Sequence, residues 1–222
     1  PYTYENDLVS IRSENNFPAG KAVVHIKYRG QPPVARRAPW DGGFQWSKDS
    51  SGNDWIAITC QSEGAKLYFP SKDHPSDEPN EGVDMHITVP KGLVVAGPGL
   101  LQKTTHKGKT STFHWKTNYT INTYSILFNV GRYKVVTRPY QTVSGNTVPM
   151  VFYVLEENAA KGQHHLALLE RMARVMEKYF GEYPWIKEKI GLAETPHLGM
   201  EHQTLNAYGN GFQYTKLGGE DF

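Results

Sequence analysis

The stretch VDMHITVP, residues 83–90, carries the clearest fold signal in the chain. Its apolar residues Val83, Met85, Ile87 and Val89 stand at every second position, and successive side chains of a strand point to opposite faces. A proline ends the run and a glycine follows two residues later, which is typical of a turn. We therefore predict a β-strand that buries one face and exposes the other.

The segments around this strand carry the same kind of signal. Residues 103–117, KTTHKGKTSTFHWKT, predict a charged hairpin with its turn at Lys107-Gly108. In residues 123–140, the most hydrophobic run of the chain, Gly131 indicates a bulge or a turn. Further strands are expected in four apolar runs: residues 21–30, 54–60, 93–102 and 123–140. Many short strands separated by turns predict a sandwich-like or saddle-like assembly of sheets.

The pattern changes after Asn158. In the run AAKGQHHLALLERMARVMEKYF, apolar residues recur at steps of three and four, which predicts an apolar stripe on an amphipathic helix. The stripe consists of Leu166, Leu169, Met172, Ala173, Met176 and Phe180. Gly181 marks the end of this helix, and Pro184 follows shortly beyond it. A strand is then expected in residues 186–194 and a second one in residues 199–209.

These patterns divide the chain near residue 156. Residues 1–156 are expected to form a mainly β N-terminal domain, and residues 157–222 a mixed α+β segment. A chain of 222 residues is long enough to bury a substantial core in such an arrangement.

The composition excludes several classes of protein. The net charge is +2 with both signs interspersed, and without a basic stripe nucleic-acid binding is not expected. No apolar run reaches the roughly 20 residues that a membrane-spanning helix needs. Cys60 is the only cysteine, so an intrachain disulfide is impossible. Because it ends an apolar run, a buried structural cysteine is favoured over a reactive one. Nothing in the sequence indicates a cellular compartment.

Common catalytic motifs are absent from the sequence. It contains neither H-E-x-x-H nor G-x-S-x-G. His164 and His165 are adjacent, so on a helix their side chains point about 100° apart and do not share a ligand face. His197 and His202 lack an obvious third ligand. We therefore predict no metal site within this chain, and we interpret the histidines as core or solvated residues.

Two stretches remain that carry more than structural signals. Residues 197–210, HLGMEHQTLNAYGN, hold one carboxylate, Glu201, directly after a glycine–methionine pair. Residues 59–79, TCQSEGAKLYFPSKDHPSDEP, combine a glutamine, a glycine and an aromatic–proline step with an acidic turn. An ordinary structural role is open for both. Glu201 fits a surface carboxylate on an edge strand, and Asp73 and Asp77 fit turn or cap residues.

Taken together, these stretches resemble one family. LGMEHQ resembles the G-x-M-E-N exopeptidase motif of the aminopeptidase N family of zinc metallopeptidases, which are gluzincins. CQSEGAKLYFPSKDHPSD resembles a segment of the N-terminal domain of that family. The segments ITVPKGLVVAGPGLL, NTYSILFNVGRY and EKYFGEYPW resemble further family segments in the same order, so the resemblance extends from about residue 55 onward. Leu198 replaces the first glycine of the motif and His202 its asparagine, which leaves the contacts to the substrate backbone open.

The resemblance implies a fold and an activity for a longer protein. The second part of the chain would be the start of a thermolysin-like catalytic domain. The zinc ligands and the catalytic residues would lie beyond Phe222, so this chain alone is expected to hold no zinc and to be inactive. Its implied partners are a peptide with a free N-terminus and the missing catalytic portion of the same protein. The alternative is a catalytically silent paralogue whose β-domain is a protein-binding scaffold.

The resemblance also implies roles for four residues. An α-amine has a pKa of about 7.7–8.0, so it is largely cationic at neutral pH and a carboxylate complements it. Glu201 would bind this amine, with Gln61 beside it from the N-terminal domain. Gly199 and Met200 would complete the substrate-binding motif, and the small Gly199 would admit a substrate backbone. The side chains of Gln61 and Glu201 are therefore expected to face one cleft.

Overall fold

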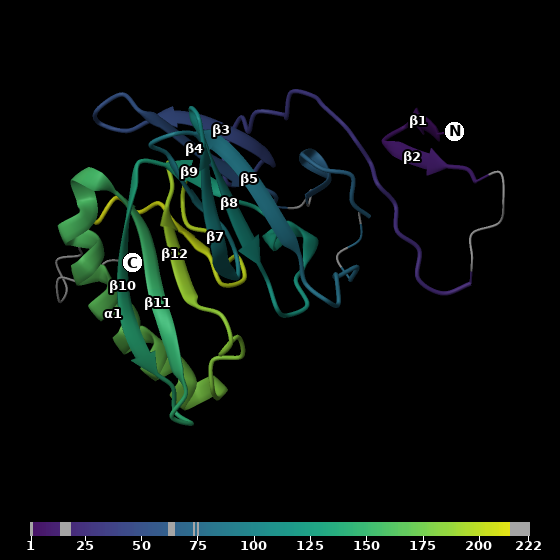
Figure 1. The fold of residues 1–222 in the computed structure, drawn as a ribbon. Coiled ribbons are helices and arrows are strands. Elements are labelled where there is room, and N and C mark those ends of the chain that lie inside the picture. Colours follow the sequence, from purple (N-terminus) through teal and green to yellow (C-terminus); the bar gives the residue numbers. More distant parts are fainter. Residues whose placement is uncertain (1, 14–18, 62–64, 73, 75, 214–222) are drawn as a thin grey trace.

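The computed structural model of the protein describes residues 2–13, 19–61, 65–72, 74 and 76–213. Strands dominate it, and they form a hairpin, a three-stranded sheet and two four-stranded sheets (Figure 1). The mainly β architecture expected from the sequence is therefore confirmed. Asp73 and the tail 214–222 lie outside the described residues. Within the described residues, no helix has the length and apolar character needed to cross a membrane.

The first four-stranded sheet is antiparallel, with the order β3-β4-β9-β6. Its strands are β3 (Gly43–Lys48), β4 (Asp54–Thr59), β6 (Val94–Ala96) and β9 (Asn129–Gly131). The strand predicted at residues 54–60 is confirmed. Cys60, which directly follows β4, is fully buried, as expected for a structural cysteine.

The three-stranded sheet is also antiparallel, with the order β5-β8-β7. Its strands are β5 (Asp84–Pro90), β7 (Leu100–Lys107) and β8 (Thr110–Lys116). The alternation predicted for β5 is confirmed, because Met85, Ile87 and Val89 are buried or half-buried between exposed residues. The predicted hairpin is β7–β8, and Gly108 turns it with a φ of +56° that favours glycine.

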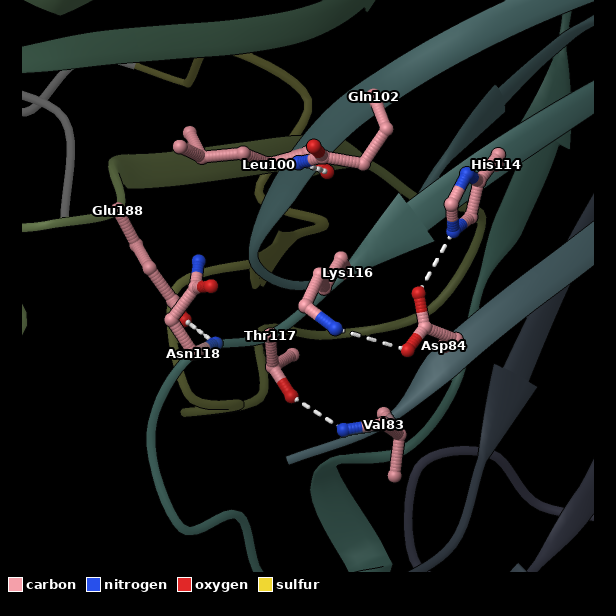
Figure 2. Close-up of polar contacts among 9 residues, drawn as sticks. All are labelled: Val83, Asp84, Leu100, Gln102, His114, Lys116, Thr117, Asn118 and Glu188. Atoms are coloured by element: carbon pink, nitrogen blue, oxygen red, sulfur yellow. Dashed lines mark hydrogen bonds and ion pairs between the residues drawn. The ribbon is translucent and has the colours of Figure 1, made fainter. Parts of the chain in front are cut away.

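A polar cluster on the outward face of this sheet aligns β5 with β8 (Figure 2). The Asp84 carboxylate lies 2.7 Å from Nε2 of His114 and 2.9 Å from Nζ of Lys116. The hydrogen bond with His114, followed by that with Lys116, holds the pKa of Asp84 below its usual value. Just after β8, Thr117 Oγ1 accepts a hydrogen bond from the Val83 backbone N–H at 2.8 Å. These contacts support the backbone pairing of β5 with β8 at one end of the ladder.

The second four-stranded sheet joins both parts of the chain. Its order is β10-β11-β12-β13, antiparallel between the first two strands and parallel between the others. The strands are β10 (Tyr133–Gln141), β11 (Thr147–Leu155), β12 (Ile190–Glu194) and β13 (Asn206–Tyr208). The predicted division near residue 156 thus separates strands of a single sheet. That division stays a prediction.

Helix α1 (Ala159–Phe180) connects β11 to β12 and packs on β10 and β11 (Figure 1). It ends at Gly181, as predicted, where φ is +88°. The predicted apolar stripe is only half right. Leu166 is buried and Leu169 and Ala173 pack against the sheet, but the remaining three positions are exposed. Those positions are Met172, Met176 and Phe180. The face of α1 that contacts the sheet is therefore narrower than the predicted apolar stripe.

Four strand predictions are wrong in whole or in part. Of residues 186–194, only Ile190–Glu194 forms a strand. Residues 21–30 form no strand, and Val23 is 81% exposed, because no neighbouring strand pairs with this run. The run 123–140 is divided between a 3₁₀ turn, β9 and β10, and the chain changes sheets after Gly131. Within residues 199–209 only β13 is a strand, because the chain turns back at Thr204, whose φ is +57°.

The remaining elements are short. They are the hairpin strands β1 (Tyr2–Glu5) and β2 (Leu8–Ile11), and the 3₁₀ turns η1 (Ala65–Leu67), η2 (Thr123–Ser125) and η3 (Glu156–Asn158). Figure 1 shows the β1–β2 hairpin well apart from the sheets.

One core cluster draws on all three larger sheets. Its buried residues include Val89, Val95, Phe113, Trp115, Val130, Tyr133, Tyr153 and Ala193. A second cluster lies between the last sheet and α1, and it includes Phe152, Val154, Leu166, Leu192 and Tyr208. The sheets of the N-terminal part and the strands after α1 are therefore held together by shared apolar burial.

Lys189, directly before β12, has a buried side chain that contacts the loop between β6 and β7 and the Trp115 ring of β8. Its side chain is 1% exposed, and its Nζ donates to the carbonyl of Gly97 at 2.8 Å and to that of Gly99. The ammonium lies 4.8 Å from the centroid of the Trp115 ring. The neighbouring Glu188 accepts the Asn118 N–H at 2.6 Å (Figure 2). Burial lowers the pKa of Lys189 to about 7.

This buried lysine predicts that stability depends on pH. The pKa is lower in the folded state than the ordinary 10.5, so the folded state binds fewer protons between these values. Stability is therefore greatest above the ordinary pKa, falls as the pH drops, and has lost this contribution below about 7. From pH 7 to pH 9 the free energy of unfolding should rise by about 2 kcal/mol through this group.

Urea unfolding at both pH values would measure this rise. Lys189→Met should remove most of it, because methionine does not titrate. Lys187→Met is the matched control, since Lys187 is exposed two positions earlier, and it should keep the rise. An equal rise in Lys189→Met and in the unmodified chain would show that other groups cause it.

Candidate functional site

The candidate site lies in the loop between β12 and β13. Met200 folds back beside β13 and exchanges two backbone hydrogen bonds with Ala207, at 3.3 and 2.8 Å. Met200 is 5% exposed, whereas the next residue, Glu201, is exposed. The apolar methionine therefore anchors the loop, and the carboxylate that follows is presented to solvent.

Gly199 permits this close approach of the loop to β13. A Cβ atom at Gly199 would lie 3.2 Å from the carbonyl oxygen of Ala207, which is tighter than most real contacts. The small residue thus has a role within the fold itself. The substrate-backbone role that the resemblance implies for Gly199 stays a prediction.

Tyr124, in the turn η2, holds Glu201 from the N-terminal part of the chain. Its hydroxyl lies 2.9 Å from the backbone oxygen of Glu201 and 3.0 Å from Oε1 of the carboxylate. Burial, followed by the hydrogen bond with Glu201, raises the pKa of Tyr124 to about 12. The hydroxyl is therefore protonated at neutral pH and acts as a donor to Glu201.

A second set of contacts joins the segment around Tyr124 to the loop that carries Glu201. The backbone N–H of Gln203 donates to Ser125 Oγ at 3.3 Å, and its side-chain Nε2 donates to the Thr120 carbonyl at 3.0 Å. Residues 120–125 therefore hold residues 201–203 at several points. Tyr124 lies in NTYSILFNVGRY, one of the segments that resemble the family, but its contact with Glu201 is not apparent from the sequence. The available signal was a tyrosine inside a segment that matched the same family as the Glu201 motif.

Gln61 lies next to the buried apolar cluster against which Tyr124 packs. It follows Cys60, which is buried in a cluster with Phe44 and Leu127, and Tyr124 packs against that cluster. Gln61 is half-buried, and its Oε1 is buried without a hydrogen-bond partner in the described part of the chain. Tyr124 therefore links the two motifs, because it packs against the cluster that contains Cys60 and holds Glu201. The convergence of the Gln61 and Glu201 side chains on one amine stays a prediction.

Two buried histidines flank Glu201. His197 is 4% exposed and His202 is 1% exposed, and burial lowers the pKa of both, that of His202 to about 4. Both are therefore neutral at pH 7. The His202 ring lies 5.3 Å from the Tyr124 ring. These are core histidines, which is one of the two readings that the sequence left open.

The described residues do not fit a zinc site. Among them, no group of three or more histidine, cysteine, aspartate or glutamate side chains is arranged to hold a metal ion. A catalytic zinc site has three protein ligands, so the described part of this chain does not supply one. That the whole chain holds no zinc stays a prediction.

Comparison with known proteins supports the fold. No protein-family model matches the chain, and no curated protein sequence matches it. Among solved structures, the M1 zinc metallopeptidase from Deinococcus radiodurans is similar, with 23% identity, a TM-score of 0.61 and 81% of this chain covered. A variant of that enzyme with a bound Tyr-Ser-Ala substrate has a TM-score of 0.60 at 23% identity. Aminopeptidase A from Legionella pneumophila has a TM-score of 0.58 at 17% identity over 79% of this chain.

This chain shares a fold with M1 zinc metallopeptidases. At these identities the likeness concerns the fold alone. The chain spans 40% of the length of the Deinococcus enzyme and 20% of that of the Legionella enzyme. The resemblance to zinc aminopeptidases that the sequence indicated is thus confirmed for the mainly β fold. The start of a thermolysin-like catalytic domain after residue 157 stays a prediction.

Proposed function

We propose that this chain is the N-terminal portion of a zinc-dependent aminopeptidase and that it carries the amine-recognition residues. The observation that carries the proposal is the Glu201 carboxylate. It is exposed, one of its oxygens is held by Tyr124, and it lies in a loop paired with β13. This arrangement occurs in a fold shared with M1 zinc metallopeptidases.

The chemistry of the loop suits a cationic amine. A positioned carboxylate forms a short charge-assisted hydrogen bond with an ammonium group. In the proposal, Glu201 binds the α-amine of a peptide and Gln61 Oε1 accepts a second hydrogen bond from it. Met200 and Gly199 set the position of Glu201 against β13, and Gly199 also faces the substrate backbone. In the full-length enzyme a zinc-activated water would supply the nucleophile. The zinc ligands would be residues outside those described.

A chelator experiment tests this function. The full-length protein that contains this chain should release the N-terminal residue from L-leucine p-nitroanilide. A chelator should abolish the activity and zinc should restore it, and the N-acetylated substrate should not be cleaved. Residues 1–222 alone should be inactive and should hold no stoichiometric zinc in metal analysis. A full-length protein without chelator-sensitive activity would contradict the proposal and favour the silent scaffold.

A further inference from the structure

The contact between Tyr124 and Glu201 restricts the orientation of the Glu201 carboxylate. A hydroxyl carries one hydrogen, and here two oxygens of the same residue lie within 3.0 Å of it. The hydroxyl thus bridges the backbone and the side chain of Glu201, which selects one rotamer of an otherwise exposed side chain. Within the described part of the chain, Oε2 has no such contact and is available to a ligand.

The position of Tyr124 is itself fixed by its surroundings. Its backbone N–H donates to Asn122 Oδ1 at 3.0 Å, which caps the turn η2. Its ring packs against the cluster around Cys60 and lies 5.3 Å from the buried His202 ring. The neighbouring Ser125 holds Gln203. The donor is therefore on a turn that is capped and packed against the core, and the carboxylate that it holds is on a loop.

We infer that Tyr124 is a positioning residue that orients the Glu201 carboxylate for amine recognition. This inference rests on the proposed function of Glu201. In the absence of the hydroxyl, Glu201 would sample several rotamers, and the binding of an amine would have to order it. Tyr124 belongs to the N-terminal part of the chain, so that part contributes to substrate recognition through a residue other than Gln61.

The test is a double-mutant cycle in the full-length protein. Tyr124→Phe keeps the ring and removes the hydroxyl. It should lower kcat/KM for L-leucine p-nitroanilide about 10-fold, as expected for a hydrogen bond to a charged group. The deamino analogue, 4-methylpentanoyl p-nitroanilide, should change less than about 2-fold if it is turned over at all. In a Glu201→Ala background, Tyr124→Phe should have no further effect.

A matched control separates positioning from general damage. Tyr119→Phe removes another hydroxyl of the same segment, one that accepts the Lys187 N–H at 3.1 Å and does not contact Glu201. It should leave kcat/KM unchanged. Asn122→Ala loosens the turn that carries Tyr124 and should reproduce part of the loss, which keeps the test available if Tyr124→Phe fails to fold. Thermal unfolding midpoints show which variants fold.

The outcomes distinguish the two proposals. If Glu201→Ala lowers kcat/KM and Tyr124→Phe does not, Tyr124 is not a positioning residue and the proposed function stands. A Tyr124→Phe loss that persists in the Glu201→Ala background, or that Tyr119→Phe matches, would also overturn the positioning role. If Glu201→Ala itself has no effect, the amine-recognition proposal fails and this inference fails with it.

Discussion

Replacing Glu201 by alanine is expected to lower kcat/KM of the full-length protein for free-amine substrates by about 100-fold. The carboxylate would form a charge-assisted hydrogen bond with the α-amine, and loss of such a bond costs roughly 3 kcal/mol. Only an ammonium group gains from this carboxylate, so amine-free analogues should be affected much less. Steady-state kinetics with L-leucine p-nitroanilide and its deamino analogue would measure the difference.

Two further variants make the Glu201 result specific. Glu201→Gln keeps an acceptor for the Tyr124 hydroxyl but removes the charge, so it should retain the fold and lose most of the discrimination. Glu81→Ala removes a glutamate whose side chain is exposed outside both motif stretches, and it should behave like the unmodified protein. Equal losses for free-amine and amine-free substrates in Glu201→Ala would contradict amine recognition, because a general defect would then explain the effect.

Glu177→Ala is expected to destabilise the chain by about 4 kcal/mol. Glu177 is 8% exposed and lies in the last turn of α1, where the helix dipole disfavours a negative charge. It is held there by the Tyr140 hydroxyl at 2.7 Å and by the backbone N–H groups of Val143 and Tyr183, each at 2.9 Å. Alanine would leave these donors without their acceptor.

Urea unfolding of the chain would measure this loss. Glu177→Gln keeps one acceptor oxygen and should cost about half as much. Lys178→Ala, an exposed neighbour in the same turn, should change the free energy of unfolding by less than about 0.5 kcal/mol. A loss below about 1 kcal/mol for Glu177→Ala would mean that water replaces the carboxylate, and that the three contacts do not hold the β10–β11 turn to the helix.

Local features of this protein could be predicted from the sequence. The alternation in residues 83–90 is that of β5, because period two reports a strand with one apolar face. The β7–β8 turn follows from Gly108, and the end of α1 from Gly181, since both residues have a positive φ. Each of these predictions depends on a few neighbouring residues, and the physical cause acts within the same segment.

Other features were decided only by tertiary structure. The run 21–30 has an apolar pattern but no partner strand, and Met172 and Met176 belong to an apolar stripe that the sheet does not reach. A sequence pattern shows which residues would gain from burial, but not whether another element covers them. Lys189 illustrates the converse, since a charged residue became buried where two carbonyls and a tryptophan ring meet it.

The candidate site divides in the same way. Glu201 was found from its motif, and the local chain explains why it follows a glycine and a buried methionine. Its contact with Tyr124, 77 positions earlier in the chain, could not be found by spacing. The contact depends on how the turn η2 and the loop before β13 are placed by separate sheets that share one core. The sequence by itself determined the chemistry of the carboxylate, and only the packing of the sheets decided which donor orients it, because hydrogen bonds act over about 3 Å in space whatever the separation along the chain.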